Sequence, residues 1–538
     1  MGPMTSEHFD VLVAGAGISG ICAGYHLQTS CPGRTYAILE ARDDIGGTWH
    51  LFRYPGIRSD SDMYTLGYSF KPWNNPKAIA DGWSILEYLR EAAREYGIDR
   101  KIRFGHRVKR ASWSSEEARW TVEVERGERK EVVRFTCNFL FMCSGYYNYA
   151  GGYMPEFPGT ERFAGRIVHP QKWTEDIDYV GKRVVVIGSG ATAVTLLPEI
   201  AKRAAHVTML QRSPTYIISM PAEDRIANWL RRHLPARAAY GITRWKNVLL
   251  GIWFYRFCRR NPKRARAMIA RWLSKELGPD YDIGTHFDPR YNPWEQRLCL
   301  VPDSDLFKTM RQGWASVVTD QIETFTEKGL KLRSGAELEA DVIVTATGLN
   351  LRLLGGLEAT VDGVRVDFAK TFNYKGMMFS DVPNLALAVG YTNASWTLKA
   401  ELICRYVCRL LTHMAKTGAR QCTPRLRDPS LEQAPFIDLT SGYVQRAIHM
   451  FPKQGSKTPW KLHQNYALDL MMLQRGKVDD GVMEFSNPAI SVARPAEAAG
   501  AVGARASGQW VSPPEAGARS AGHVADRRSS RWARSPGG

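Results

Sequence analysis

Two glycine-rich turns in this 538-residue chain have the spacing that binds the pyrophosphate of a dinucleotide. The first, Gly15-Ala16-Gly17-Ile18-Ser19-Gly20, follows a short apolar run at residues 9–14 and leads into a helical pattern. Gly15 permits the turn, Gly17 lets the backbone approach the phosphates, and Gly20 lets the helix pack closely on the strand. The sequence therefore predicts a strand, turn and helix whose N-terminus faces an anion.

An acid follows the next apolar run of this unit. Glu40 comes directly after residues 36–39 and twenty positions after Gly20, where a carboxylate accepts a hydrogen bond from a ribose hydroxyl. The same carboxylate would repel a 2′-phosphate. This half of the chain is therefore expected to bind FAD or NAD rather than NADP, and the competing interpretation is a glycine-rich turn of an unrelated α/β protein.

The second unit carries a basic residue at the position where the first unit carries Glu40. An apolar run at residues 183–187 leads into Gly188-Ser189-Gly190-Ala191-Thr192-Ala193, in which alanine replaces the third glycine. The strand expected at residues 207–210 is followed by Arg212 and Ser213 instead of an acid. A guanidinium and a hydroxyl suit a 2′-phosphate, so this half is expected to bind NADPH. The competing interpretation is an exposed arginine after a strand.

The cysteines do not indicate a metal or disulfide site. All nine are scattered, without a Cys-x-x-Cys pair, and the chain shows no secretory signal, so reduced thiols in a cytoplasmic protein are expected. A disulfide reductase of similar architecture would carry a redox pair after its first Gly-Gly, which this chain lacks. No zinc or iron–sulfur centre is predicted.

The net charge of +18 is concentrated in one segment. Residues 225–276 contain fourteen Lys and Arg against a single acid, Glu276, together with several tryptophans. Two interpretations stay open: a helical insertion with a solvated basic face, or a peripheral docking segment for an anionic membrane, such as the inner face of the cell membrane. Nucleic acid is not expected as a partner.

The order of these units predicts an α/β fold with two Rossmann-like dinucleotide-binding domains, for FAD and NADPH, and a helical insertion in the NADPH domain. The FAD domain is expected at 1–150 and 376–490, the NADPH domain at 151–220 and 290–375, and the insertion at 221–289. From 491 to 538 the composition falls to Ala, Gly, Ser, Pro and Arg, which predicts a disordered tail.

Two longer patterns add a resemblance to a family. The linker between the turns carries Phe163, Gly165, His169 and Trp173, and the first half carries Gly46-Gly47-x-Trp49, Tyr54-Pro55-Gly56 and Asp60. Both patterns resemble those of class B flavin monooxygenases of the Baeyer–Villiger type. The resemblance covers about residues 7–490.

The resemblance implies a role for each matching residue. The implied FAD contacts, with the glycines Gly15, Gly17 and Gly20, are Ser19, Glu40, Thr48, Trp49, His50, Leu51, Asp60 and Val108. The implied NADPH contacts are Arg58, Ser59, Asp60, Gly188, Ser189, Gly190, Ala191, Thr192, Ala193, Val194, Arg212 and Ser213. Arg297 would be the catalytic arginine and Asp60 the carboxylate that orients it, while Phe163, Gly165, His169 and Trp173 would form the hinge.

One departure concerns the residue before the catalytic arginine. Gln296 stands where many such enzymes have a lysine that supports the cofactor phosphate, so the preference for NADPH depends mainly on Arg212 and Ser213.

The implied activity is monooxygenation with NADPH and O₂. A C4a-peroxyflavin would insert one oxygen beside the carbonyl of a small apolar ketone, giving an ester or lactone, and would also oxygenate thioethers or thioamides. Two alternatives stay open: a heteroatom oxygenase acting only on sulfur or nitrogen, and an uncoupled NADPH oxidase or redox flavoprotein that docks on a membrane or partner.

Overall fold

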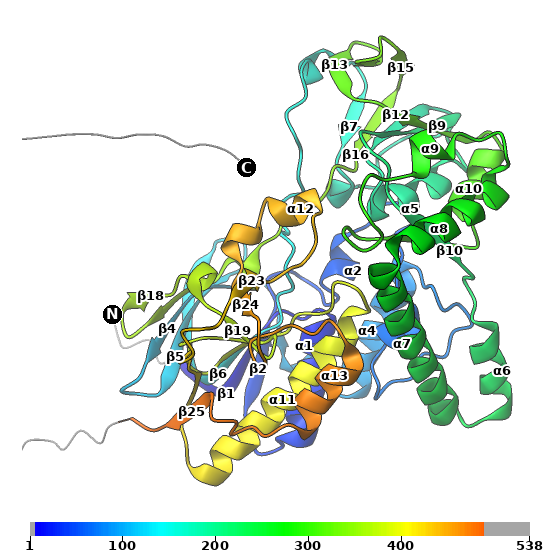
Figure 1. Ribbon diagram of the computed structural model, residues 1–538. Helices are drawn as coiled ribbons and strands as arrows, with labels where there is room; N and C mark the ends of the chain where they lie inside the picture. Colours follow the sequence, from blue (N-terminus) through cyan, green and yellow to red (C-terminus); the bar gives the residue numbers. More distant parts are fainter. Residues whose placement is uncertain (1–5, 489–538) are drawn as a thin grey trace, which may run out of the picture. The chain divides into compact units, whose positions relative to one another are not determined.

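The structure is a computed structural model that describes residues 6–488 (Figure 1). The beginning of the chain and the predicted tail at 491–538 lie outside the described residues.

A nine-stranded sheet holds the first glycine turn. Its order is β18-β17-β4-β5-β6-β1-β2-β3, with β21 pairing the end of β6. The strands are β1 (Glu7–Ala14), β2 (Tyr36–Leu39), β3 (Ile102–Arg103), β4 (His106–Ser114), β5 (Arg119–Arg126), β6 (Glu131–Met142), β17 (Glu358–Val361), β18 (Val364–Arg365) and β21 (Leu385–Leu387). Strands β2, β1, β6 and β21 run parallel, and β4, β5 and β6 form an antiparallel meander.

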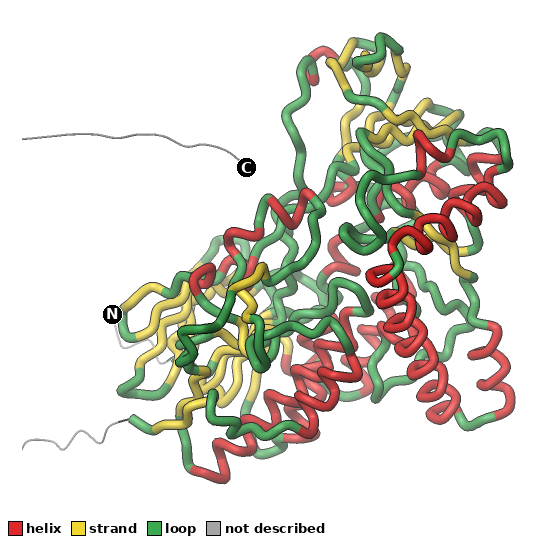
Figure 2. Tube along the Cα trace, in the orientation of Figure 1, coloured by secondary structure: helices red, strands yellow, loops and turns green. Residues whose placement is uncertain are grey.

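The central strand β1 is apolar because both of its faces are covered. Val11, Leu12 and Val13 are fully buried, as expected for a parallel strand with neighbours on both faces. Helix α1 (Ile18–Ser30) starts directly after the glycine turn and lies beside α11 (Trp396–Thr417) on one face of the sheet (Figure 2). Gly20 is required here, since a Cβ on it would lie 1.8 Å from the carbonyl oxygen of Gly15. The predicted strand, turn and helix are confirmed.

The second glycine turn belongs to a five-stranded parallel sheet in the order β12-β9-β8-β16-β7. Its strands are β7 (Arg166–Val168), β8 (Arg183–Ile187), β9 (His206–Gln211), β12 (Ala315–Thr319) and β16 (Val342–Thr345). Helix α5 (Ala191–Ile200) follows β8 and begins at the turn, and α10 (Asp305–Arg311) packs against α5. A three-stranded antiparallel sheet of β13 (Ile322–Thr326), β14 (Gly329–Leu332) and β15 (Glu337–Glu339) precedes β16.

The boundary predicted at residue 376 differs from the sheet pairing. β17 pairs in parallel with β4, with Glu358 opposite Arg110, so residues 358–365 belong to the first sheet. The position of β17 is set by backbone pairing with a strand more than two hundred residues away. No local sequence pattern predicts this pairing. The segment predicted for the NADPH domain therefore ends before residue 358.

The basic segment is helical, as predicted. It contains α6 (Arg225–His233), α7 (Ala236–Arg260) and α8 (Pro262–Leu277), and α9 (Ile283–Phe287) follows it. The parallel pair β10 (Ile217–Met220) and β11 (Cys299–Pro302) closes the insertion at its base. None of the helices within residues 6–488 combines the length and apolar content that crossing a bilayer requires.

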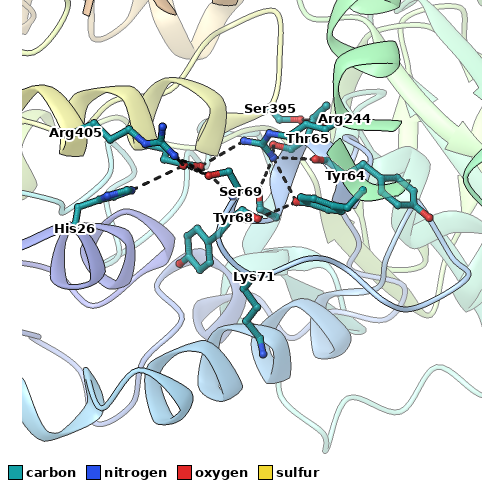
Figure 3. Close-up of polar contacts among 12 residues, drawn as sticks. His26, Tyr64, Thr65, Tyr68, Ser69, Lys71, Arg244, Ser395 and Arg405 are labelled. Atoms are coloured by element: carbon teal, nitrogen blue, oxygen red, sulfur yellow. Dashed lines mark hydrogen bonds and ion pairs between the residues drawn. The ribbon is translucent and has the colours of Figure 1, made fainter. Parts of the chain in front are cut away.

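The buried side chain of Arg244 connects α7 to residues 64–67 and to α11 (Figure 3). Arg244 donates to the carbonyl oxygens of Tyr64 and Gly67, both at 2.8 Å, and forms an ion pair with Glu401 of α11 at 3.5 Å. Burial opposes the charge of Glu401, but Arg244 and Arg405 outweigh burial and lower its pKa. The inner face of α7 is therefore fixed by hydrogen bonds and charge.

The described chain contains further α-helices and strands. They are α2 (Thr48–Leu51), α3 (Met63–Leu66), α4 (Gly82–Glu95), α12 (Gly442–Gln445) and α13 (Tyr466–Leu470), with the strand pairs β19 (Asn373–Tyr374) and β20 (Met378–Phe379), β22 (Gln421–Pro424) and β25 (Met483–Ser486), and β23 (Gln433–Pro435) and β24 (Lys453–Gly455).

Candidate active site

A cavity of about 1060 Å³ is lined by both glycine turns. It is larger than the few hundred to about 1,000 Å³ of a typical small-ligand pocket. Gly15 and Gly17 line it from the first turn, and Gly188 and Gly190 from the second. Both turns follow the carboxyl ends of parallel strands, where open α/β sheets bind their ligands.

Glu40 is held in the wall of the cavity beside the first turn. One of its carboxylate oxygens accepts from the backbone N–H of Ala16 at 2.7 Å, and the other accepts from the N–H of Arg42 at 2.9 Å. Burial raises the pKa of Glu40. Glu40 thus also fixes the glycine turn, a role that the sequence pattern did not suggest.

The Gly46-Gly47 segment brings a second backbone stretch against this turn. Both glycines have positive φ, +112° and +55°, which explains the residue type. Helix α2 follows and places Thr48 and Trp49 in the cavity wall, together with Ser19 and Val108. His50 and Leu51 do not line the cavity, and the His50 ring lies instead between the guanidinium groups of Arg42 and Arg53.

Arg297 and Asp60 form an ion pair in the cavity wall. The Nε of Arg297 donates to Oδ2 of Asp60 at 2.9 Å, and its Nη2 donates to the same oxygen. The negative charge of Asp60 raises the pKa of Arg297 further above its ordinary value. Arg297 lies just before β11, so folding brings together two residues 237 positions apart. The structure contains the contact that the resemblance implies, and the catalytic role of Arg297 with Asp60 as its orienting carboxylate stays a prediction.

The cavity wall includes the second turn and the residues expected at a 2′-phosphate. Gly188 has φ +126°, and a Cβ on it would lie 2.4 Å from the carbonyl oxygen of Ala346. Ser189, Ala191, Thr192, Arg212, Ser213 and Gln296 also line the cavity. Ala193 and Val194, which the resemblance assigned to the cofactor, are fully buried in the core instead.

Arg58 has a partner that the sequence did not reveal. Its Nη1 forms an ion pair with Oδ2 of Asp305, on α10, at 2.5 Å. Arg58 and the neighbouring Ser59 still line the cavity. A phosphate would therefore have to compete with Asp305 for Arg58.

Comparison with known proteins decides the family. Residues 9–229 match the model of the flavin-binding monooxygenase-like family. The chain is 55% identical over 482 residues to the FAD-containing monooxygenase EthA of Mycobacterium tuberculosis H37Rv, covering 89% of this chain and 98% of EthA. The chain belongs to the FAD-containing monooxygenase family.

Other members and solved structures agree with this placement. The probable FAD-binding monooxygenase AlmA of Acinetobacter baylyi is 48% identical over 490 residues, covering 91% of this chain and 98% of AlmA. A closed crystal structure of cyclohexanone monooxygenase has a TM-score of 0.69 at 20% identity, covering 90% of this chain and all of that one. An oxidized steroid monooxygenase bound to NADP has a TM-score of 0.68 at 23% identity, covering 89% of this chain and all of that one. These likenesses confirm the predicted fold with two dinucleotide-binding domains.

The linker residues of this monooxygenase lie outside the cavity lining. The His169 Nε2 lies 3.2 Å from the carbonyl oxygen of Gly348, three residues after the end of β16. A Cβ on Gly165 would lie 2.4 Å from the Asp341 carbonyl, Phe163 packs on Phe325, and Trp173 is buried in the core of the second sheet. The linker thus contains β7 and contacts the segment after β16 through His169, and its role as a hinge stays a prediction.

Arg446 is a cavity residue that the sequence did not single out. Its guanidinium lies 3.4 Å from the centre of the Tyr153 ring, and both line the cavity. Burial lowers the pKa of Arg446, and the nearby positive charge of Arg212 lowers it further. Arg446 and Arg212 are more than two hundred residues apart in the chain, and only the fold brings them into one region.

Tyr391 lines the cavity and is held from behind by a buried ion pair. Its hydroxyl donates to Oδ2 of Asp469 at 2.6 Å, and Nζ of Lys399 lies 2.8 Å from the same oxygen. Asp469 and Lys399 are almost fully buried. The pair fixes the orientation of the Tyr391 ring in the cavity wall.

We expect Tyr391→Phe to lower the free energy of unfolding by about 1.5 kcal/mol, because it removes a donor to a buried charge. Equilibrium denaturation of the two proteins measures the difference. Tyr64→Phe is the matched control, since the buried Tyr64 hydroxyl has no hydrogen-bond partner among residues 6–488. The control should be neutral or stabilising, and equal losses in both variants would contradict the role of Asp469.

Proposed function

We propose that this protein is a Baeyer–Villiger monooxygenase that uses FAD, NADPH and O₂ to convert a small apolar ketone into an ester or lactone. The observation that supports this most strongly is the Arg297–Asp60 pair in the wall of a cavity lined by two dinucleotide-binding turns. One ligand at each turn brings a reductant and an oxygen-activating group into the same cavity. The fixed positive charge of Arg297 would then stabilise the negative charge that develops when a carbonyl is oxygenated.

The first turn fits FAD. Gly15, Gly17 and Gly47 present bare backbone at the start of α1, and Glu40 repels the phosphate of NADP. Thr48 and Trp49, which follow Gly47 in the cavity wall, would also hold the cofactor. When bound, FAD accepts hydride from NADPH and activates O₂, which no side chain can do.

The second turn fits NADPH. Gly188 and Gly190 leave the N-terminus of α5 open to a pyrophosphate, and Arg212 and Ser213 would bind the 2′-phosphate. Arg446 adds a second cation to this side of the cavity. The carboxylate of Glu40 beside the first turn and the guanidinium of Arg212 after β9 would direct each cofactor to its own turn.

Arg297 would stabilise negative charge that develops at the reacting carbonyl. A guanidinium is suited to this task because it does not lose its proton, and Asp60 holds it in one orientation. The side chains of Tyr146, Tyr147, Trp396 and Tyr443 line the same cavity and would accept an apolar substrate.

The test is to incubate the FAD-loaded protein with NADPH, O₂ and an aryl ketone that also carries a methyl thioether. The proposal expects one added oxygen located as an ester by mass and fragmentation, with sulfoxide as an additional product. Formation of the sulfoxide without ester would favour the heteroatom-oxygenase alternative. NADPH consumption that yields only hydrogen peroxide would favour the oxidase alternative.

A further inference from the structure

The outward face of α6 and α7 is apolar and exposed in the described chain. We name it the α6–α7 face: Ile226, Trp229, Ile242, Trp245, Leu249 and Trp253, each between 42% and 60% exposed. Five tryptophans are exposed among residues 6–488, and three of them lie on this face. Scattered exposure of single apolar residues is ordinary, but such a concentration of tryptophan marks an interaction surface.

The spacing of these residues makes a continuous stripe along α7. Ile242, Trp245, Leu249 and Trp253 follow one another at intervals of three and four, and the stripe continues with the exposed Arg256 and Arg260. Residues at these intervals share one face of a helix. The apolar part extends about 17 Å at 1.5 Å per residue. Three helical turns of apolar surface thus end in two arginines.

The opposite face of α7 packs against the protein, so rotation of the helix about its axis cannot bury the stripe. Tyr240, Arg244 and Val248 are buried against the first sheet's helices, and Arg244 is held by the network drawn in Figure 3. Trp245 also contacts Tyr466 of α13, and the chain after Tyr466 exposes Leu468 and Met471. The stripe is therefore part of a wider apolar surface on a fixed support.

The charged side chains of α6 and α7 are all positive. Arg225, Arg232, Arg237, Arg256 and Arg260 are exposed, and none forms an ion pair with another residue in 6–488. Tryptophan and leucine beside unpaired arginines are the composition of a helix that lies in the interface of an anionic bilayer. A second copy of this chain would bring two such arginine clusters together, which like-charge repulsion disfavours.

We propose that the α6–α7 face docks the enzyme on the surface of an anionic phospholipid bilayer. The apolar stripe enters the boundary between headgroups and acyl chains, and the flanking arginines contact lipid phosphates. The insertion thereby brings the cavity close to a phase that concentrates apolar substrates. The docking does not depend on the proposed oxygenation, so each can fail without the other.

The experiment is cosedimentation of the FAD-loaded full-length protein with vesicles of phosphatidylcholine and phosphatidylglycerol, or of phosphatidylcholine alone. We expect binding to the anionic vesicles at low salt, weaker binding at high salt, and weaker binding to neutral vesicles. The double variant Trp245→Ala/Trp253→Ala should lower the partition coefficient about tenfold or more. Arg256→Gln/Arg260→Gln should lower it about tenfold at low salt and much less at high salt.

The matched control is Trp83→Ala/Trp314→Ala, which removes two exposed tryptophans outside the face. This control should bind vesicles like the wild type, and NADPH oxidation with a water-soluble substrate should be the same in all four proteins. Absence of wild-type binding at low salt would overturn the proposal, as would equal losses in the control and face variants. Self-association that the face variant abolishes, without vesicle binding, would assign the face to a second copy instead.

Discussion

Replacing Arg297 with alanine should lower the rate of ester formation by about 10²- to 10³-fold while FAD remains bound. This is the size of effect seen when one fixed group that stabilises developing negative charge is removed. Arg297 is the charge that Asp60 holds in the cavity wall, and it is not among the residues expected to contact FAD. The measurement is ester formation per bound flavin, with FAD content read from the visible spectrum.

Two further variants separate charge from geometry. Arg297→Lys retains the positive charge but loses the two-nitrogen contact with Asp60, so it should recover part of the rate. Asp60→Asn leaves the guanidinium in place without its charged partner and should give an intermediate loss. Normal ester formation by Arg297→Ala would show that the cavity works without this cation, and loss of FAD would mean that the residue has a structural role instead.

Replacing Arg212 with alanine should raise KM for NADPH by about 10- to 100-fold and leave KM for NADH almost unchanged. A charged hydrogen bond contributes about 1.5–3 kcal/mol, which corresponds to this change in affinity. Only NADPH carries the 2′-phosphate, so only its binding should respond. Steady-state kinetics with each nucleotide measures the two constants.

Arg203→Ala provides the control, because Arg203 is also exposed beside the second sheet but does not line the cavity. It should alter neither KM. An equal rise for NADPH and NADH in Arg212→Ala would show that Arg212 supports the turn rather than the phosphate. Retention of full NADPH preference would shift that role to Arg446, the second cation on this side.

Local patterns predicted the elements that contain both glycine turns. The strands at residues 183–187 and 36–39 were expected from their apolar runs, and β8 and β2 have these bounds. These elements can be predicted because a glycine with positive φ and a buried apolar strand are each recognisable from a few consecutive residues. The predicted Arg297–Asp60 contact came from the family resemblance and not from spacing.

Contacts between distant segments could not be predicted in this way. The pairing of β17 with β4, the ion pair of Arg58 with Asp305, and the position of Arg446 each depend on the folded chain. The same is true of Arg244, whose buried contacts distinguish it from the exposed arginines around it. In sequence it is one of fourteen basic residues, and only the structure shows that it anchors α7.

The most direct test of the central claim is to supply ¹⁸O-labelled O₂ to the FAD-loaded enzyme with NADPH and an aryl ketone. Baeyer–Villiger oxygenation predicts an ester that carries one labelled oxygen between the carbonyl carbon and the migrated group, with one NADPH oxidised for each ester. Unlabelled ester, or NADPH oxidation that yields labelled hydrogen peroxide and no ester with any ketone, would contradict it.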